Sequence, residues 1–235
     1  MTHTVHPYAH RLGIIRDWKS RWFAAGKKNF RENIRVDAAI RAFIAKRLRS
    51  MYIGNVEIER TDSELRIIIH TARPGLVIGR SGENAVKLRK QMGEVVHTAA
   101  PADKRAVKID IVEIRQAETN AAVVAYMVAE GLEKRMPFRR ILKQTVEKVM
   151  AVREVQGVRI VVSGRLGGAE MSRREEIKRG RIPLQTFRAD IDFATEKAYL
   201  PYGVIGVKVW IYQGNIYPGM ERRQAEARPA APARA

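Results

Sequence analysis

The sequence predicts an α+β protein built from two modules. Residues 38–115 show a helical pattern, two strand patterns, a glycine turn, a second helical pattern and a third strand pattern. Residues 116–214 show two helical patterns and then a series of strand patterns. Such grouping is typical of helices packed on one face of a mainly antiparallel sheet. Residues 1–37 form a basic-aromatic arm, and residues 215–235 are an Ala/Pro/Arg-rich, basic tail that we expect to be disordered.

Changes in hydrophobic periodicity define the first module. From Val36 to Leu48, apolar residues recur at helical spacing. Residues 53–60 and 64–71 alternate apolar and charged positions around a short polar turn, which predicts two strands. Residues 106–113 alternate in the same way and predict a third strand.

A glycine loop lies between the second and third predicted strands. It reads Gly79-Arg80-Ser81-Gly82, and a helical pattern follows from Glu83 to about Gly93. Glycines have no Cβ, so the backbone can lie flat against a sugar-phosphate chain, and the helix start directs free N–H groups at phosphates. The order of elements resembles the type II KH module (αββααβ), an RNA-binding fold. The candidate RNA-binding residues of the loop and its helix are Gly79, Arg80, Ser81, Gly82 and Lys87.

The second module begins with two predicted helices separated at Met136-Pro137, because proline restricts the residue before it and begins helices well. The stretch between the first two predicted strands is interpreted as a glycine-rich turn followed by a basic loop. The predicted helices are residues 119–134 and 138–152, and the predicted strands are residues 157–163, 182–189, 192–199 and 203–212.

The composition points to a large polyanionic partner. Lys and Arg number 44 against 25 Asp and Glu, which gives a formal charge of +19. The excess lies in three separated runs, at residues 11–49, 134–153 and 164–188, which suits a folded RNA better than a small-molecule substrate. The longest apolar run, residues 121–129, is about half of the roughly 20 residues needed to span a bilayer. The absence of cysteine excludes disulfides and fits a cytoplasmic protein.

The second predicted helix has a basic side of its own. Leu142, Val146, Val149 and Met150 fall on one stripe of a helix that begins at Phe138. Arg139, Arg140 and Lys143 mostly point elsewhere, toward solvent or RNA. A guanidinium can pair with a phosphate through two parallel hydrogen bonds, which suits holding a sliding strand without reading its bases.

Catalytic and metal sites are weakly supported, so we expect no enzyme activity, no cofactor and no bound metal. Asp190 and Asp192 could share a strand face, but no third carboxylate or His lies near them in sequence, and Arg188 is a plausible ion-pair partner. His3, His6 and His10 have helical spacing that Pro7 interrupts. The run from Gly164 to Gly168 lacks the spacing of a nucleotide-phosphate loop.

Several segments together resemble the universal small-subunit ribosomal protein three family, bacterial type. They extend along the chain in the expected order, except for the tail, and the blocks at 163–170 and 202–211 are far more specific than the glycine loop. The segments are Val5-His6-Pro7, Arg11 to Ile14, His70 to Gly82, Phe138-Arg139-Arg140, Ser163 to Glu170, Leu184 to Asp192 and Tyr202 to Ile211.

The resemblance implies a non-enzymatic constituent of the small-subunit head, located in cytoplasmic ribosomes. It implies contacts with small-subunit (16S) rRNA, with proteins ten and fourteen, and with mRNA where it enters between proteins three, four and five. Arg139, Arg140 and Lys143 match the family positions that face the mRNA and help to open structured message. The candidate rRNA-binding residues are Arg11, Arg16, Lys19, Arg165, Arg173, Arg174, Lys178 and Arg179.

One alternative remains open at this point, a free KH-containing assembly or regulatory factor that binds RNA transiently. The extent of the chain that resembles the ribosomal family discriminates between this factor and a ribosomal protein. A free KH factor would not need the 163–170 and 202–211 blocks or the arm.

Overall fold

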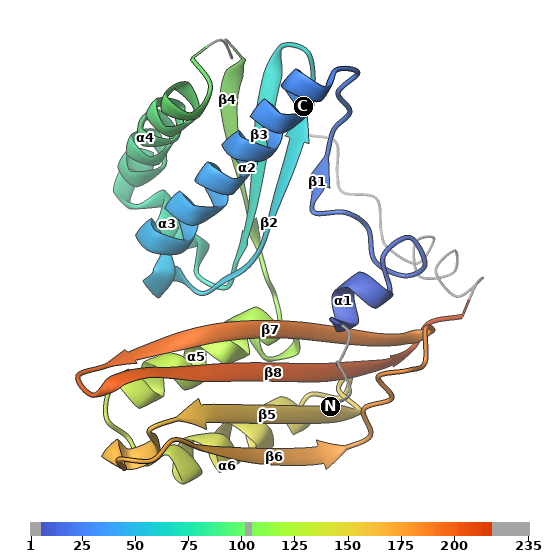
Figure 1. The fold of residues 1–235 in the computed structure, drawn as a ribbon, viewed down its shortest axis with the longest axis vertical. Helices are drawn as coiled ribbons and strands as arrows, with labels where there is room; N and C mark the ends of the chain where they lie inside the picture. Colours follow the sequence, from blue (N-terminus) through green and yellow to red (C-terminus); the bar gives the residue numbers. More distant parts are fainter. Residues whose placement is uncertain (1–5, 102–104, 218–235) are drawn as a thin grey trace.

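The computed structural model describes residues 6–101 and 105–217, which form two α+β modules stacked end to end (Figure 1). The upper module in Figure 1 is the KH module and the lower one is the C-terminal module. His3 and most of the predicted disordered tail lie outside the described residues.

The KH module has the predicted order of elements, αββααβ. Its sheet has the order β1-β2-β3-β4, in which β2 and β3 are antiparallel and β4 lies parallel to β3. Apolar side chains from the helices and from one face of the sheet form the core, including Ile44, Leu65, Ile67 and Met92. The elements are α2 (Lys27–Arg47), β2 (Ile53–Arg60), β3 (Glu64–Thr71), α3 (Pro74–Ile78), α4 (Glu83–Ala99) and β4 (Ala106–Glu113).

Both long helices of the KH module extend beyond the predicted ranges. α2 begins at Lys27, ten residues or so inside the predicted arm, because its first turns are charged and show little apolar periodicity. α4 continues past Gly93 to Ala99, and Val96 is buried in the core. A glycine inside a helix costs only about 1 kcal/mol relative to alanine, which the burial of the last turn offsets.

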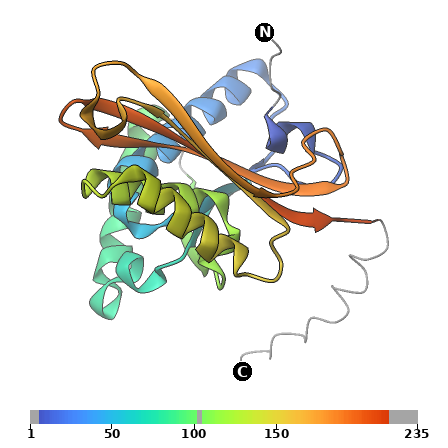
Figure 2. The same ribbon diagram turned by 90° about the horizontal axis from the view of Figure 1, so that it is seen from below.

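The C-terminal module is a four-stranded antiparallel sheet with two helices on one face. The strand order is β6-β5-β8-β7, and all three pairings are antiparallel. The two helices cover the inner face of the sheet, as Figure 2 shows from below. The elements are α5 (Ala121–Glu133), α6 (Phe138–Met150), β5 (Gly157–Gly164), β6 (Arg173–Gly180), β7 (Ala189–Leu200) and β8 (Gly203–Asn215).

One strand of this sheet differs from the prediction. Residues 182–189 were predicted as a strand, but only Ala189 belongs to one, and the edge strand is instead β6, in the predicted basic loop. β6 has a single apolar residue, Ile177, which faces the core, and its charged side chains are mostly exposed. An edge strand is held by backbone pairing on one side only, so its sequence need not look apolar. Ile182 and Leu184 pack against the small cluster around Trp210 instead of forming a strand.

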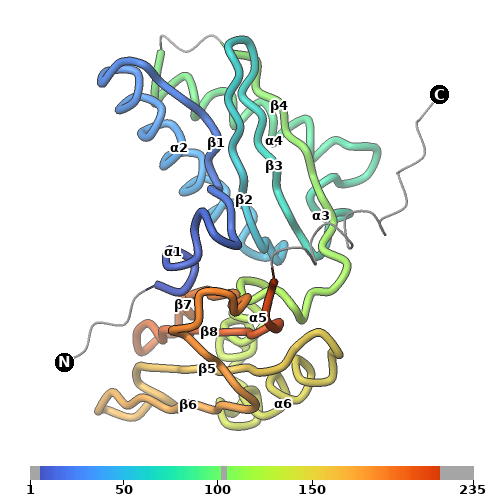
Figure 3. The backbone as a smooth tube through the Cα atoms, turned by 90° about the vertical axis from the view of Figure 1, so that its right-hand side faces the viewer, coloured from blue at the N-terminus to red at the C-terminus, as the bar shows by residue number. Residues whose placement is uncertain are grey.

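The N-terminal arm, residues 6–26 of the described chain, connects the two modules. Figure 3 shows it passing from α1 (Pro7–His10) up to β1 (Ser20–Arg21), which lies parallel to β2. Trp22 anchors the arm to the KH module, since its Nε1 donates to the Asp37 carboxylate at 2.9 Å. Trp22 therefore serves as an anchor for the arm.

Side chains at the domain boundary join the modules. Arg49, after α2, forms an ion pair with Glu133 of α5 at 2.6 Å and also donates to the carbonyl oxygen of Lys197 in β7. The Tyr52 hydroxyl donates to the Glu130 carboxylate, and its ring lies edge-on to Tyr126. α5 therefore packs on its own sheet and also holds the KH module.

Candidate nucleic-acid interface

The glycine loop of the KH module has the backbone geometry that its sequence requires. Gly79 and Gly82 have φ values of +75° and +78°, in the left-handed region that favours glycine. A Cβ on Gly79 would meet the side chain of Asn84 at 2.6 Å, so the close approach also excludes a larger residue. Arg80 and Ser81 between them are exposed.

The start of α4 leaves its first N–H groups available. Its N-cap is Gly82, and no side chain caps this end of the helix. Lys87 is exposed and lies 3.5 Å from the carboxylate of Glu83, one turn earlier. The structure thus brings all five predicted loop residues together at one accessible edge of the KH module.

The basic side of α6 is exposed, as predicted. Ile141, Leu142, Val146 and Val149 are buried against β5 and α5, and Ile141 is a core residue that the sequence stripe missed. Arg139, Arg140 and Lys143 are exposed.

The Arg139 guanidinium is held loosely. It lies 3.3 Å from the Glu175 carboxylate of β6 and 5.6 Å from the centre of the Phe138 ring, while its side chain remains 71% exposed. An ion pair of this exposure contributes little to stability, so an incoming phosphate can displace it at small cost.

The four predicted basic residues of β6 are all exposed, but alternation divides them between two faces. Arg173 lies over the Phe138 ring of α6 at 5.4 Å, on the inner side of the strand. Arg174 lies 3.2 Å from Glu176 and, with Lys178, points to the other side. Arg173 and Arg179 therefore extend the α6 surface, whereas Arg174 and Lys178 belong to a separate one.

Predicted rRNA-binding residues outside β6 also make contacts within the protein. Arg165 donates to the carbonyl oxygens of Ala169 (2.8 Å) and Tyr202 (3.2 Å), which fixes the glycine-rich loop. Arg16 forms an ion pair with Asp190 at 2.6 Å and is about one-third exposed. Lys19 is exposed, with its ammonium 4.8 Å from the centre of the Tyr8 ring.

Arg11 is a correction to the predicted rRNA-binding set. Its side chain is fully buried, and the guanidinium donates to carbonyl oxygens of Pro7, Ala189, Leu184 and Thr186 at 2.6–3.0 Å. Burial lowers the pKa of this guanidinium from its ordinary value. A charge enclosed in this way has no surface to offer a phosphate, so Arg11 fastens α1 to the segment before β7.

The described residues of the two candidate sites for catalysis and metal binding are engaged in other contacts, and His3 lies outside the described residues. The predicted Arg188 partner of the Asp190/Asp192 pair is wrong, because Arg16 pairs with Asp190 while Asp192 accepts from the Ala121 backbone N–H at 2.7 Å. His6 and His10 pack against Phe193 and Phe187. Within residues 6–101 and 105–217, no group of three His, Asp or Glu side chains could hold a metal, and no helix is long and apolar enough to cross a membrane.

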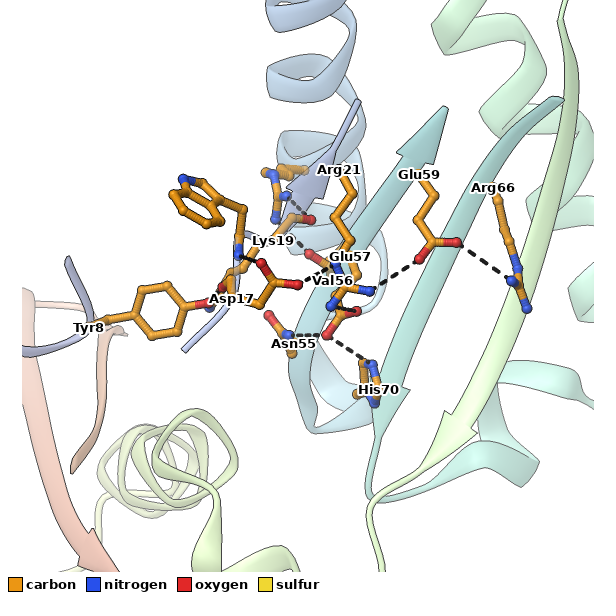
Figure 4. A network of polar contacts seen from close by, with 12 residues as sticks. Tyr8, Asp17, Lys19, Arg21, Asn55, Val56, Glu57, Glu59, Arg66 and His70 are labelled. Carbon is orange, nitrogen blue, oxygen red and sulfur yellow. Dashed lines mark hydrogen bonds and ion pairs between the residues drawn. The ribbon is translucent and has the colours of Figure 1, made fainter. Parts of the chain in front are cut away.

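The open face of the KH sheet carries a charge network that the sequence analysis did not recognise (Figure 4). Arg21 lies near Asp17, Glu57 and Glu59, and Arg66 pairs with Glu59 and Asp110. His70 lies 3.5 Å from Glu57. The sequence carried a signal for this network at the outward positions of two predicted strands, where the first strand has Glu57 and Glu59 and the second has Arg66 and His70. The acidic side chains of the network pair with the local arginines, so this face is not a continuation of the basic surfaces.

The comparisons with known proteins agree with this arrangement. Residues 39–119 match the KH domain model, and residues 128–211 match the model for the C-terminal domain of ribosomal protein S3. A small ribosomal subunit protein uS3 from Clostridium perfringens (strain SM101 / Type A) is 45% identical over 218 residues, 93% of this chain and 95% of the relative. A uS3 protein from Ectopseudomonas mendocina (strain ymp) is 45% identical over 237 residues, 99% of this chain and 97% of the relative. This chain belongs to the uS3 family.

Membership of the uS3 family confirms the resemblance seen in the sequence and the α+β class with a KH domain. It supports a structural role in the small ribosomal subunit and partners among ribosomal RNA and proteins. A free KH factor is not supported, because the uS3 match extends through the C-terminal module. The roles of individual residues remain predictions.

Proposed function

We propose that this chain is a constituent of the small-subunit head of cytoplasmic ribosomes that binds 16S rRNA and lines the channel through which mRNA enters. Arg139, Arg140 and Lys143 of α6 face the message. The RNA-facing residues of the KH loop and of β6 contact RNA backbone. The protein partners are small-subunit proteins ten and fourteen and, around the incoming mRNA, four and five.

The observation that carries the mRNA assignment is the division of α6 into two sides. One side is locked into the core by Leu142, Val146 and Val149, each at most 3% exposed. The other side presents three cations to solvent on a rigid helix. Exposed cations with few hydrogen bonds inside the protein can pair in turn with successive phosphates of a moving RNA strand, without reading its bases.

The rRNA assignment rests on charge and on its distribution. Exposed basic residues occur on the KH loop in one module, and on α6 and both faces of β6 in the other. Several separated cationic surfaces on one rigid body fit a large folded RNA that surrounds the protein. Each phosphate contact releases counterions, so the affinity adds up over the surfaces.

The mRNA role is tested with the double variant Arg139→Ala/Arg140→Ala. Both side chains are exposed and contribute little to packing, so we expect the unfolding free energy to change by less than about 1 kcal/mol. Ribosomes that carry the variant are expected to translate unstructured message at the normal rate but to advance several-fold more slowly through a stable hairpin, measured by single-turnover elongation assays.

The matched control is Arg31→Ala/Arg35→Ala, which removes two exposed arginines from another helix, α2. This control is expected to leave elongation through the hairpin unchanged. Equal hairpin rates for wild type, control and the α6 variant would contradict the proposed role of Arg139 and Arg140.

A further inference from the structure

Alternation along the C-terminal sheet gives it an outer face distinct from the surface around α6. Val158, Ile160, Val162 and Val207 point inward and pack under α5 and α6. The residues between them point outward, away from both helices. This outer face is turned toward the viewer in Figure 1, with the helices behind the sheet.

The pairing register aligns the outward residues in rows across the four strands. One row runs from Arg174 of β6 through Ser163 and Gly206 to Lys197 of β7. The next row runs from Glu176 through Val161 and Lys208 to Thr195. The residues of each row lie side by side because paired positions face the same way.

The first row has small residues, Ser163 and Gly206, between two basic residues, Arg174 and Lys197; we call this stretch the floor. Neighbouring strands lie about 4.8 Å apart, so Arg174 and Lys197 are separated by about 14 Å along the row. Only a hydroxyl and a glycine lie between them, and a Cβ on Gly206 would already come within 3.3 Å of the Ser163 hydroxyl oxygen. A shallow depression at this place is lined by Thr195, Glu196, Lys197, Tyr199, Gly206, Val207 and Lys208.

The charge of the outer face is largely uncompensated. Glu176 is the acidic residue within the two rows, and Arg159 and Arg174 already hold it at 2.6 Å and 3.2 Å. Glu196 also lines the depression, but its position in β7 is paired with Val207, which packs on the inner face of the sheet. Lys178, Lys197 and Lys208 are exposed, and among the residues that the structure describes none of these lysines has an ion-pair partner. The open face of the KH sheet, by contrast, pairs its acidic side chains with its own arginines (Figure 4).

We propose that this outer face, built from Arg174, Lys178, Lys197 and Lys208 around Ser163, Thr195 and Gly206, binds the sugar-phosphate backbone of structured rRNA. Between Arg174 and Lys197 the first row carries only Ser163 and Gly206, so no bulky side chain of this floor holds a backbone away, and the Ser163 and Thr195 hydroxyls can donate to phosphate oxygens. The site is separate from α6, which lies on the other face of the same sheet. The inference deepens the proposed rRNA binding and rests on it.

The test is the full-length double variant Lys197→Gln/Lys208→Gln, rebound to small subunits from which this protein has been removed. Each lost lysine–phosphate contact lowers the magnitude of the slope of log K against log salt by about 0.7–0.9, so the loss of two contacts is expected to lower it by about 1.4–1.8. The control Lys46→Gln/Lys108→Gln removes the same charge from exposed positions outside every proposed surface and is expected to keep the wild-type slope. Hairpin elongation is expected to remain normal.

A second measurement identifies what covers the face. The substitution Thr195→p-benzoylphenylalanine places a photo-crosslinker at an exposed position of the depression. A crosslink to rRNA is the expected result. A crosslink to a protein, or a slope equal to that of the control together with no crosslink, would overturn this inference while leaving rRNA binding by the rest of the chain intact. Failure of the unaltered chain to rebind would instead remove the proposed function itself.

Discussion

At the scale of single residues, Arg11 shows a cation used inside the fold. Its guanidinium donates to carbonyl oxygens of Pro7 in α1, of Leu184 and Thr186 in the segment before β7, and of Ala189 at the start of β7, so one side chain satisfies four backbone acceptors. Buried carbonyls without a partner cost about 1–3 kcal/mol each. The contact holds the N-terminal arm against the C-terminal module.

The substitution Arg11→Met tests this structural role. It keeps much of the aliphatic volume but leaves the carbonyls unpaired, so we expect the free energy of unfolding to fall by about 2–4 kcal/mol, measured by urea denaturation. The exposed control Arg35→Met is expected to change it by less than about 0.5 kcal/mol.

The salt dependence of rRNA binding by Arg11→Met distinguishes a structural role of Arg11 from a direct RNA contact. We expect folded Arg11→Met protein to keep the wild-type salt dependence of rRNA binding, because the residue touches no solvent. A reduced salt slope with unchanged stability would show that Arg11 contacts RNA after all.

At the scale of secondary-structure elements, the first turn of α5 is held by one local side chain and one from a distant strand. Its N-cap Asn120 accepts hydrogen bonds from the backbone N–H groups of Ala122 (3.0 Å) and Val123 (3.3 Å). Asp192, on the neighbouring strand β7, accepts from the Ala121 N–H. These carboxamide and carboxylate groups satisfy donors that the first turn leaves open and complement the positive end of the helix.

The substitution Asn120→Ala is expected to lower the free energy of unfolding by about 1 kcal/mol, which is typical for the loss of an N-cap. Thermal denaturation of the full chain measures the change. Gln116→Ala is a suitable comparison, because its side chain makes one long, exposed hydrogen bond and should matter little. An equal loss in both variants would mean that Asn120 does not act as a cap.

The elements also show which parts of the fold the sequence can predict. The ranges of β2, β3 and β4 match the prediction because apolar residues on one face of each strand pack on the KH core, which requires alternation. β6 was missed because charged residues occupy nearly every position of this edge strand. The apolar residues Ile182 and Leu184 suggest a strand, yet they are partly buried on irregular backbone that packs against the cluster around Trp210.

At the scale of the whole molecule, the two modules are tied by contacts that no local pattern predicts. Arg49–Glu133 and Tyr52–Glu130 each join residues more than seventy positions apart in the sequence. Tyr52 itself has φ of +52°, an uncommon conformation for an aromatic residue, which the surrounding contacts must stabilise. The exposed helix face and glycine loop were predictable from spacing, whereas the outer face of the C-terminal sheet required the strand register.

The Tyr52 contact makes a prediction about alkaline pH. Burial, and then the hydrogen bond to Glu130, raise the pKa of Tyr52 from 10.0 to about 12. The folded state therefore favours the protonated phenol, so its contribution to stability is complete below pH 10 and is lost as the pH rises toward 12. We expect the urea midpoint of the wild type to fall more between these pH values than that of Tyr52→Phe, which cannot ionise. Parallel falls would contradict the assigned role of the phenol.

The central claim concerns the whole particle: basic surfaces spread over both modules hold the protein on one large structured RNA. The most direct test is sedimentation of small subunits after a high-salt wash, with the amount of this protein per particle measured by quantitative mass spectrometry. The account predicts about one copy per small subunit, because several surfaces must release their phosphates together before the protein dissociates. Particles that lack the protein, while it remains in the soluble fraction, would contradict the account.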